Sequence, residues 1–143
     1  MSSILEVGKN KEKCQKFTPD ILVKTMLDCA GYKTNLIGKT VLENSFGTGN
    51  ILKAIVIRYI ENAIAIGTEP ENIANGLSRD IYGIELDKVL FDACVAGLND
   101  ILKRYAIPAV DWKLFNDNAL SFDLNISFDY IIGNPPYISY REM

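Results

Sequence analysis

Residues 43–50 read Glu43-Asn44-Ser45-Phe46-Gly47-Thr48-Gly49-Asn50, and this stretch decides the fold. Residues 40–44, which overlap its start, predict a short strand, and residues 50–65 repeat apolar side chains at helical spacing. The two glycines let the backbone pass close to a ligand, and the helix that follows offers unpaired N–H groups to an anionic group. We therefore expect a strand, a ligand-binding loop and a helix in succession.

Two other phosphate-binding loops fit this stretch less well. The dinucleotide fingerprint requires a third glycine where Leu52 stands, which disfavours classical NAD binding. Gly38-Lys39-Thr40 resembles the end of a P-loop, but Lys33 occupies the position of the earlier glycine and the triplet precedes the strand. We interpret the triplet as a turn that enters the strand.

Strands and helices alternate along the rest of the chain, which predicts an α/β fold with a parallel sheet and helices on both faces. Strands are expected at residues 40–44, 81–85, 111–115 and 128–132. Helices are expected from Thr18, as N-cap, to a stop at Gly31, and over residues 50–65 and 88–105. Residues 67–78 are rich in Gly, Pro, Asn and Glu and are interpreted as a linker-like insertion.

Acidic residues stand at or just after the ends of three successive strands: Glu43, Glu85 and Asp117. The carboxyl ends of parallel strands share one edge of a sheet, where open α/β sheets bind ligands. Glu85 is suited to accept hydrogen bonds from ribose hydroxyls, whereas Asp87 is expected to cap the next helix. Each acid alone would be an ordinary strand end or turn, but together they favour a binding crevice.

The most specific motif is Asn134-Pro135-Pro136-Tyr137, directly after the fourth strand. Two prolines fix the backbone and remove two N–H donors, which leaves carbonyl groups and the Asn side chain as a rigid set of acceptors. Such a set suits a planar NH₂ group, and the following tyrosine can stack on the ring that bears it. The alternative is a rigid turn with a packed tyrosine.

Composition excludes several kinds of chemistry and partner. The 143 residues include no histidine, so neither a Ser/His/Asp triad nor a His-bearing metal cluster can form within the chain. The three cysteines are widely spaced and indicate reduced thiols, and no metal site is expected. The sequence shows neither a signal peptide nor a membrane span, which places the protein in the cytoplasm.

Charge is distributed unevenly. Residues 1–40 carry seven Lys and four acids, a net charge of +3, and the remainder carries eight Lys and Arg against fourteen acids, a net charge of −6. Strong DNA binding by this chain alone would favour a basic balance. We therefore expect this region to bind a cofactor, with the main contacts to nucleic acid made elsewhere.

The ordered motifs from Phe17-Thr18-Pro19 to Tyr137 resemble those of S-adenosylmethionine-dependent N6-adenine DNA methyltransferases of restriction-modification systems. The resemblance implies a Rossmann-like methyltransferase fold, S-adenosyl-L-methionine as cofactor and double-stranded DNA as partner. The implied cofactor-binding residues are Phe17, Thr18, Pro19, Glu43, Asn44, Ser45, Phe46, Gly47, Thr48, Gly49, Glu85, Leu86, Asp117, Asn118 and Ala119. The implied catalytic residues are Asn134, Pro135, Pro136 and Tyr137.

The family assigns distinct roles to these groups. Thr18 and the loop 43–49 would hold the methionine end of the cofactor, Glu85 its ribose and Asp117 its adenine. Asn134 and the Pro135 carbonyl would accept hydrogen bonds from the target amine, and Tyr137 would stack on the flipped base. The chain departs from the family at Glu43-Asn44, where Asp-Pro is usual, so the carboxylate is kept and the proline is lost.

Two alternatives share the same motif. Protein-glutamine N5-methyltransferases also carry Asn-Pro-Pro-Tyr, since a side-chain amide presents a planar NH₂ group. A cofactor-binding subunit without catalytic activity is the second alternative. The Phe17-Thr18-Pro19 motif upstream of the glycine loop favours the DNA enzymes.

The family sheet has seven strands, and only four are expected here. We therefore expect residues 1–143 to form the N-terminal part of one methyltransferase domain, with a helical segment at 1–38 and the cofactor-binding half of the sheet at 39–143. Alone, this piece is expected to be nearly inactive on DNA and to self-associate through the unpaired edge of its fourth strand.

Overall fold

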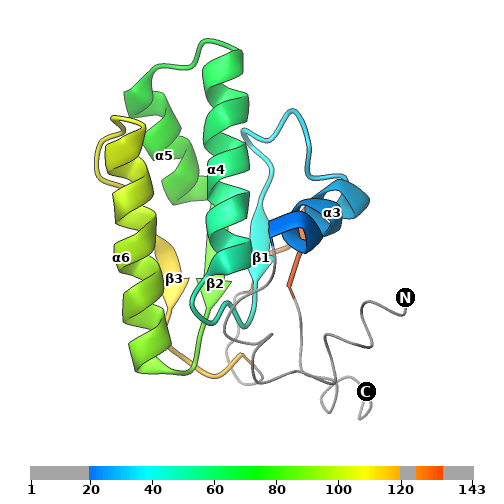
Figure 1. The fold of residues 1–143 in the computed structure, drawn as a ribbon, viewed down its shortest axis with the longest axis vertical. Coiled ribbons are helices and arrows are strands. Elements are labelled where there is room, and N and C mark those ends of the chain that lie inside the picture. Colours follow the sequence, from blue (N-terminus) through cyan, green and yellow to red (C-terminus); the bar gives the residue numbers. More distant parts are fainter. Residues whose placement is uncertain (1–19, 120–124, 134–143) are drawn as a thin grey trace.

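The strands form one parallel sheet in the computed structural model, which describes residues 20–119 and 125–133. The strand order is β3-β2-β1-β4, and all three neighbouring pairs are parallel (Figure 1). The strands are β1 (Val41–Glu43), β2 (Ile81–Ile84), β3 (Lys113–Phe115) and β4 (Tyr130–Ile131). Each lies within the range expected from the sequence, so the α/β fold is confirmed.

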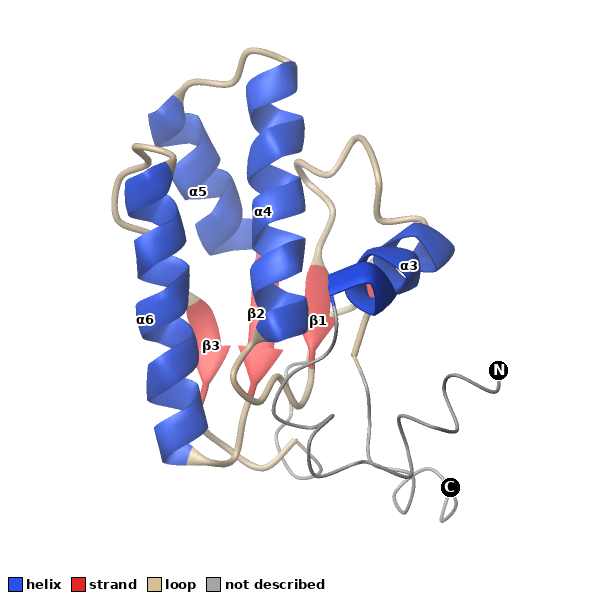
Figure 2. Cartoon of the chain, viewed as in Figure 1, coloured by secondary structure: helices blue, strands red, loops and turns tan. Residues whose placement is uncertain are grey.

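The helices are α3 (Asp20–Ala30), α4 (Asn50–Ala65), α5 (Pro70–Asp80) and α6 (Lys88–Arg104). Helices α3, α4 and α6 lie against one face of the sheet (Figure 2). On the opposite face the side chain of Ile131 is 67% exposed. The sequence predicts helices on both faces, and within the described residues they are found on the face that α3, α4 and α6 cover. No helix in this part of the chain is long and apolar enough to cross a membrane.

The interpretation of residues 67–78 as a linker-like insertion is wrong, because most of this stretch belongs to α5. Pro70 stands in the first turn with Glu71, and Arg79 stands in the last turn, as suits the helix dipole. Ile73 and Leu77 face the core at helical spacing. The composition of this stretch is typical of a loop, but the burial of one narrow apolar stripe determines the structure.

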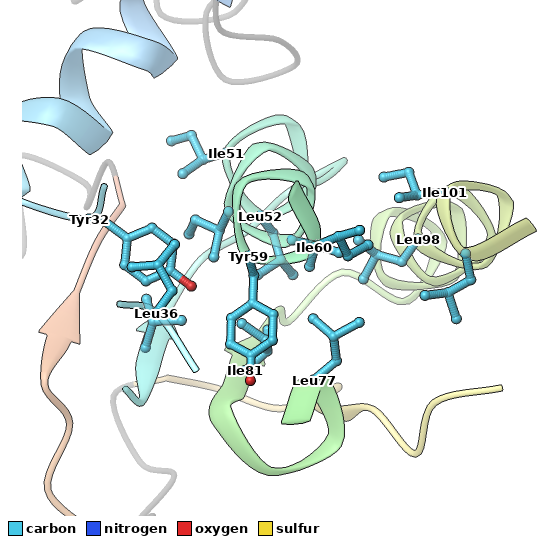
Figure 3. Packing of buried hydrophobic residues seen from close by; sticks show 14 of the residues in the cluster. Tyr32, Leu36, Ile51, Leu52, Tyr59, Ile60, Leu77, Ile81, Leu98 and Ile101 are labelled. Carbon is cyan, nitrogen blue, oxygen red and sulfur yellow. The ribbon is translucent and has the colours of Figure 1, made fainter. Parts of the chain in front are cut away.

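The core lies between the sheet and the helices and is centred on α4. Tyr59 and Ile60 of α4 are fully buried, with Leu77 of α5 and Leu98 of α6 packed in the same cluster (Figure 3). Asp80, also buried, accepts hydrogen bonds from the Tyr59 hydroxyl at 2.6 Å and from the Gly38 amide at 2.7 Å. Burial combined with these bonds fixes α5 against α4 and the turn before β1.

The register of β4 on β1 is fixed by a reciprocal pair of side chains at the amino ends of the two strands. Asp129 Oδ2 accepts from the Thr40 amide at 2.9 Å, and Thr40 Oγ1 accepts from the Asp129 amide at 3.1 Å. The ladder continues with the Ile132 amide donating to the Leu42 carbonyl at 3.0 Å. A slip of β4 would break all three bonds, so the chain leaves β4 at a defined place beside Glu43.

Candidate functional site

The loop between β1 and α4 requires glycine at its end. Gly49 has φ +92°, a left-handed conformation that L side chains rarely adopt, and it is the N-cap of α4. A Cβ at this position would strike Cys94 Sγ of α6. Gly47 also has a positive φ, of 59°. The loop therefore runs close to α6 and leaves the first amides of α4 without a side-chain cap.

Glu85 links this loop to the end of β2. Its side chain is 8% exposed, and Oε1 accepts a hydrogen bond from the Gly47 amide at 2.6 Å. Oε2 accepts from the Asp87 amide at 3.0 Å. Asp87 caps α6 as expected, accepting from the amides of Val89 and Leu90. One carboxylate thus positions both the glycine loop and the start of α6.

Glu43, at the end of β1, is almost completely buried. Its Oε1 accepts a hydrogen bond from the Ser45 amide at 2.9 Å. Burial raises its pKa to about 7, and the Glu85 carboxylate adds to the rise while the Ser45 amide opposes it. Glu43 therefore takes up a proton more readily than an ordinary glutamate.

The third acid lies beside the second, as the strand order requires. The Asp117 amide donates to the Glu85 carbonyl at 3.2 Å, and Asp117 Oδ1 accepts from the Asn118 amide at 2.7 Å. Asn116, which is not among the residues predicted from the sequence, donates from Nδ2 to the carbonyls of Glu85 and Leu86, both at 2.9 Å. The strands β1, β2 and β3 lie side by side and parallel (Figure 1), so the three acids at or just after their carboxyl ends stand along one edge of the sheet.

The remaining candidate residues differ in burial. Phe46 is 4% exposed and its ring packs 5.8 Å from that of Phe91, so it belongs mainly to the core. Leu86, by contrast, is 67% exposed beside Glu85. Asn44, Ser45, Thr48 and Ala119 lie on the partly or fully exposed side of the loops. Phe17–Pro19 and Asn134–Tyr137 lie outside the described residues.

The free energy of unfolding of Glu43→Gln, relative to that of the wild type, is expected to increase as the pH rises. The folded pKa near 7 exceeds the ordinary 4.5, so the unfolded chain releases this proton first and the wild type loses stability between these two pH values. Glu43→Gln removes the loss, a gain of roughly 3 kcal/mol over that interval, at about 1.4 kcal/mol per pKa unit. Urea unfolding at pH 4.5 and 7.5 measures it, with the exposed Glu71→Gln as control. Parallel pH profiles for wild type and Glu43→Gln would contradict the expectation.

No group of three potential metal ligands occurs among the described side chains. What the site does offer is carboxylate oxygens, backbone amides of a glycine loop and exposed apolar side chains at Leu86 and Val89. These groups suit a ligand with hydroxyl groups, a polar or charged tail and a flat ring.

Comparison with known proteins identifies relatives over most of the chain. Residues 53–143 match the family model described as Eco57I restriction-modification methylase. The Type II methyltransferase M.BstVI of Geobacillus stearothermophilus is 33% identical, over 85% of this chain and 24% of its own length. The Type II methyltransferase M.PaeR7I of Pseudomonas aeruginosa is 32% identical, over 85% and 22%. The chain therefore spans about a quarter of the length of the curated relatives it matches.

A solved structure has the same fold. The modification subunit of a putative type I restriction enzyme from Vibrio vulnificus YJ016 superposes with a TM-score of 0.57 at 19% identity. The match covers 85% of this chain and 23% of the other. At this identity the likeness concerns the fold, and it supports the arrangement of strands and helices described above.

Proposed function

This chain belongs to the Eco57I restriction-modification methylase family, and from that premise we propose that it forms part of a DNA methyltransferase that modifies N6 of adenine with S-adenosylmethionine. The observation that carries the proposal is the sheet edge at which Glu85 holds the Gly47 amide of the glycine loop. Glu43 stands at the start of that loop, and Asp117 is bonded to Glu85 through its backbone amide. The family description supports methylation in a restriction-modification system, and the relatives are named Type II methyltransferases.

The residues at this edge fit the cofactor. Each carboxylate oxygen of Glu85 accepts a single N–H bond in the contacts described above, so each keeps a lone pair for a ribose hydroxyl. Leu86 and Val89, both exposed beside Glu85, offer apolar surface to the adenine ring, and Asp117 to Ala119 lie next to them in the proposed assignment. Residues 43–49, with Thr18, would hold the methionine end.

The methyl group comes from the sulfonium of the cofactor when it is bound. The chain must then present a weakly nucleophilic amine to that methyl, since the lone pair of adenine N6 is delocalised into the ring. In our proposal the Asn134 side chain and the Pro135 carbonyl accept the two N–H bonds and stabilise the positive charge that develops on nitrogen. In the same proposal Pro136 would restrict the backbone of this segment, and Tyr137 would stack on the base.

Methyl incorporation tests the proposal. The full-length protein is incubated with methyl-labelled S-adenosylmethionine and duplex DNA, and the digested product is examined for N6-methyladenine by mass spectrometry. Label in N6-methyladenine supports the proposal. Label in protein glutamine, or cofactor binding with no transfer to DNA of varied sequence, would favour one of the two alternatives.

Asp117→Ala is expected to weaken cofactor binding by about 10- to 100-fold, the loss typical of a hydrogen bond to a charged group. The variant should fold normally, because the side chain is exposed and Asp117 contacts Glu85 through its backbone amide. Asp111→Ala, at the other end of the same strand, is the matched control and should bind normally. Titration calorimetry with S-adenosylhomocysteine measures both, and equal affinity in the two variants would contradict the assignment.

Three further statements remain predictions. They are the cytoplasmic location, the low activity of residues 1–143 alone and their self-association. The last is supported by the place of β4 at the edge of the described sheet and by the exposure of Ile131 and Ile126.

A further inference from the structure

Gly133 follows β4 and directly precedes Asn134, yet its backbone does not explain why it is glycine. Its φ lies outside the left-handed region that Gly47 and Gly49 occupy. Alanine could therefore adopt the same backbone conformation. The space around Gly133 therefore accounts for the glycine.

That space is filled by one side chain. A Cβ on Gly133 would find Glu43 Oε1 at 2.8 Å, Cδ at 3.1 Å and Oε2 at 3.5 Å, and these are its three nearest atoms. The first distance is shorter than real Cβ contacts, so either the carboxyl or the chain leaving β4 would have to move. The absence of a side chain at Gly133 thus lets the backbone approach the Glu43 carboxyl directly.

Neither partner is free to move. The Glu43 carboxyl is held by the Ser45 amide at 2.9 Å within an almost completely buried site. The chain at Gly133 is held by the β1–β4 ladder and by the pair formed by Thr40 and Asp129. The carboxyl therefore lies between the start of the glycine loop and the chain immediately before Asn134.

We propose that Glu43 is a positioning residue that sets the distance between the glycine loop and Gly133, the residue directly before Asn134. The inference rests on the proposed function, in which the loop holds the methyl donor and Asn134 holds the acceptor amine. The Ser45 amide of the loop holds this carboxyl, and the carboxyl lies against Gly133, so it fixes the end of β4 relative to the loop. In-line methyl transfer depends on that alignment.

Gly133→Ala tests the proposal in the full-length protein. We expect kcat for methyl transfer to fall by about 10- to 100-fold, as for a displacement of roughly 1 Å, while cofactor affinity changes by less than about threefold. Glu43→Asp withdraws the carboxyl by one methylene group, so the double variant should recover part of the lost kcat. Gly97→Ala, whose Cβ would meet only the flexible side chain of Lys53, is the control and should keep wild-type kcat.

The outcomes separate the two proposals. A wild-type protein that transfers no methyl group to adenine would overturn the proposed function, and the contact would then be tested by thermal unfolding alone. There, Gly133→Ala should destabilise the Glu43→Asp background less than it destabilises the wild type, and additive effects would overturn the contact. With an active wild type, normal kcat in Gly133→Ala, or no recovery in the double variant, would overturn the positioning role.

Discussion

Asn134→Ala is expected to lower methyl transfer to adenine by about 10²- to 10³-fold, the loss typical of removing one group that stabilises charge in a transition state. Cofactor affinity should change by less than about threefold, because in our proposal the amide oxygen acts on the target amine and does not contact the cofactor. Asn134→Ala is thus expected to impair methyl transfer while sparing cofactor binding.

The measurement pairs single-turnover methylation of duplex DNA with calorimetry on the same preparation. Asn99→Ala is the matched control, since Asn99 accepts a hydrogen bond from Trp112 Nε1 at the surface of α6 and should not affect transfer. Tyr137→Ala should be milder than Asn134→Ala if stacking contributes about 1 kcal/mol, the low end of its usual range. Near-normal turnover in Asn134→Ala would exclude the mechanism.

Most of the sheet could be predicted because its signals are local. An apolar run followed by a glycine turn predicts β1 and α4. The expected helix 50–65 coincides with α4 (Asn50–Ala65). The helix α5 could not be predicted in the same way. Its residues are mostly polar, and only the packing of Ile73 and Leu77 against α4 distinguishes it from a loop.

The candidate site was predictable only as a location. Because the carboxyl ends of parallel strands lie at one edge of a sheet, the sequence alone predicts that Glu43, Glu85 and Asp117 lie near one another. Which atoms contact each other depends on tertiary packing over long separations in the chain. The bond between Glu85 and Gly47 joins residues 38 positions apart, and Asn116 reaches back 31 positions to Glu85. Neither contact leaves a pattern in the sequence.

Gly49→Leu is expected to reduce cofactor affinity by more than about 100-fold, because two separate effects act at this position. The φ of +92° costs any L residue about 1–2 kcal/mol. In addition, the new side chain would enter the space of Cys94 Sγ, which is buried under the loop. The loop would have to move away from α6, and the bond that the Gly47 amide donates to Glu85 at 2.6 Å would be lost with it.

A pair of alanine variants separates these two effects, because Gly38 offers the same backbone conformation in open space. Its φ is +89°, and a Cβ there would have no neighbour within 4 Å. Gly38→Ala should therefore show the cost of the left-handed conformation alone, measured by thermal unfolding, with cofactor affinity unchanged. Gly49→Ala should cost more stability than Gly38→Ala and should also weaken cofactor binding. Adding Cys94→Ala to Gly49→Ala should recover part of both losses, since it removes the sulfur atom. If Gly38→Ala and Gly49→Ala cost the same and neither affects the cofactor, the close approach of the loop to α6 has no part in binding, and the ligand must be held elsewhere along the sheet edge.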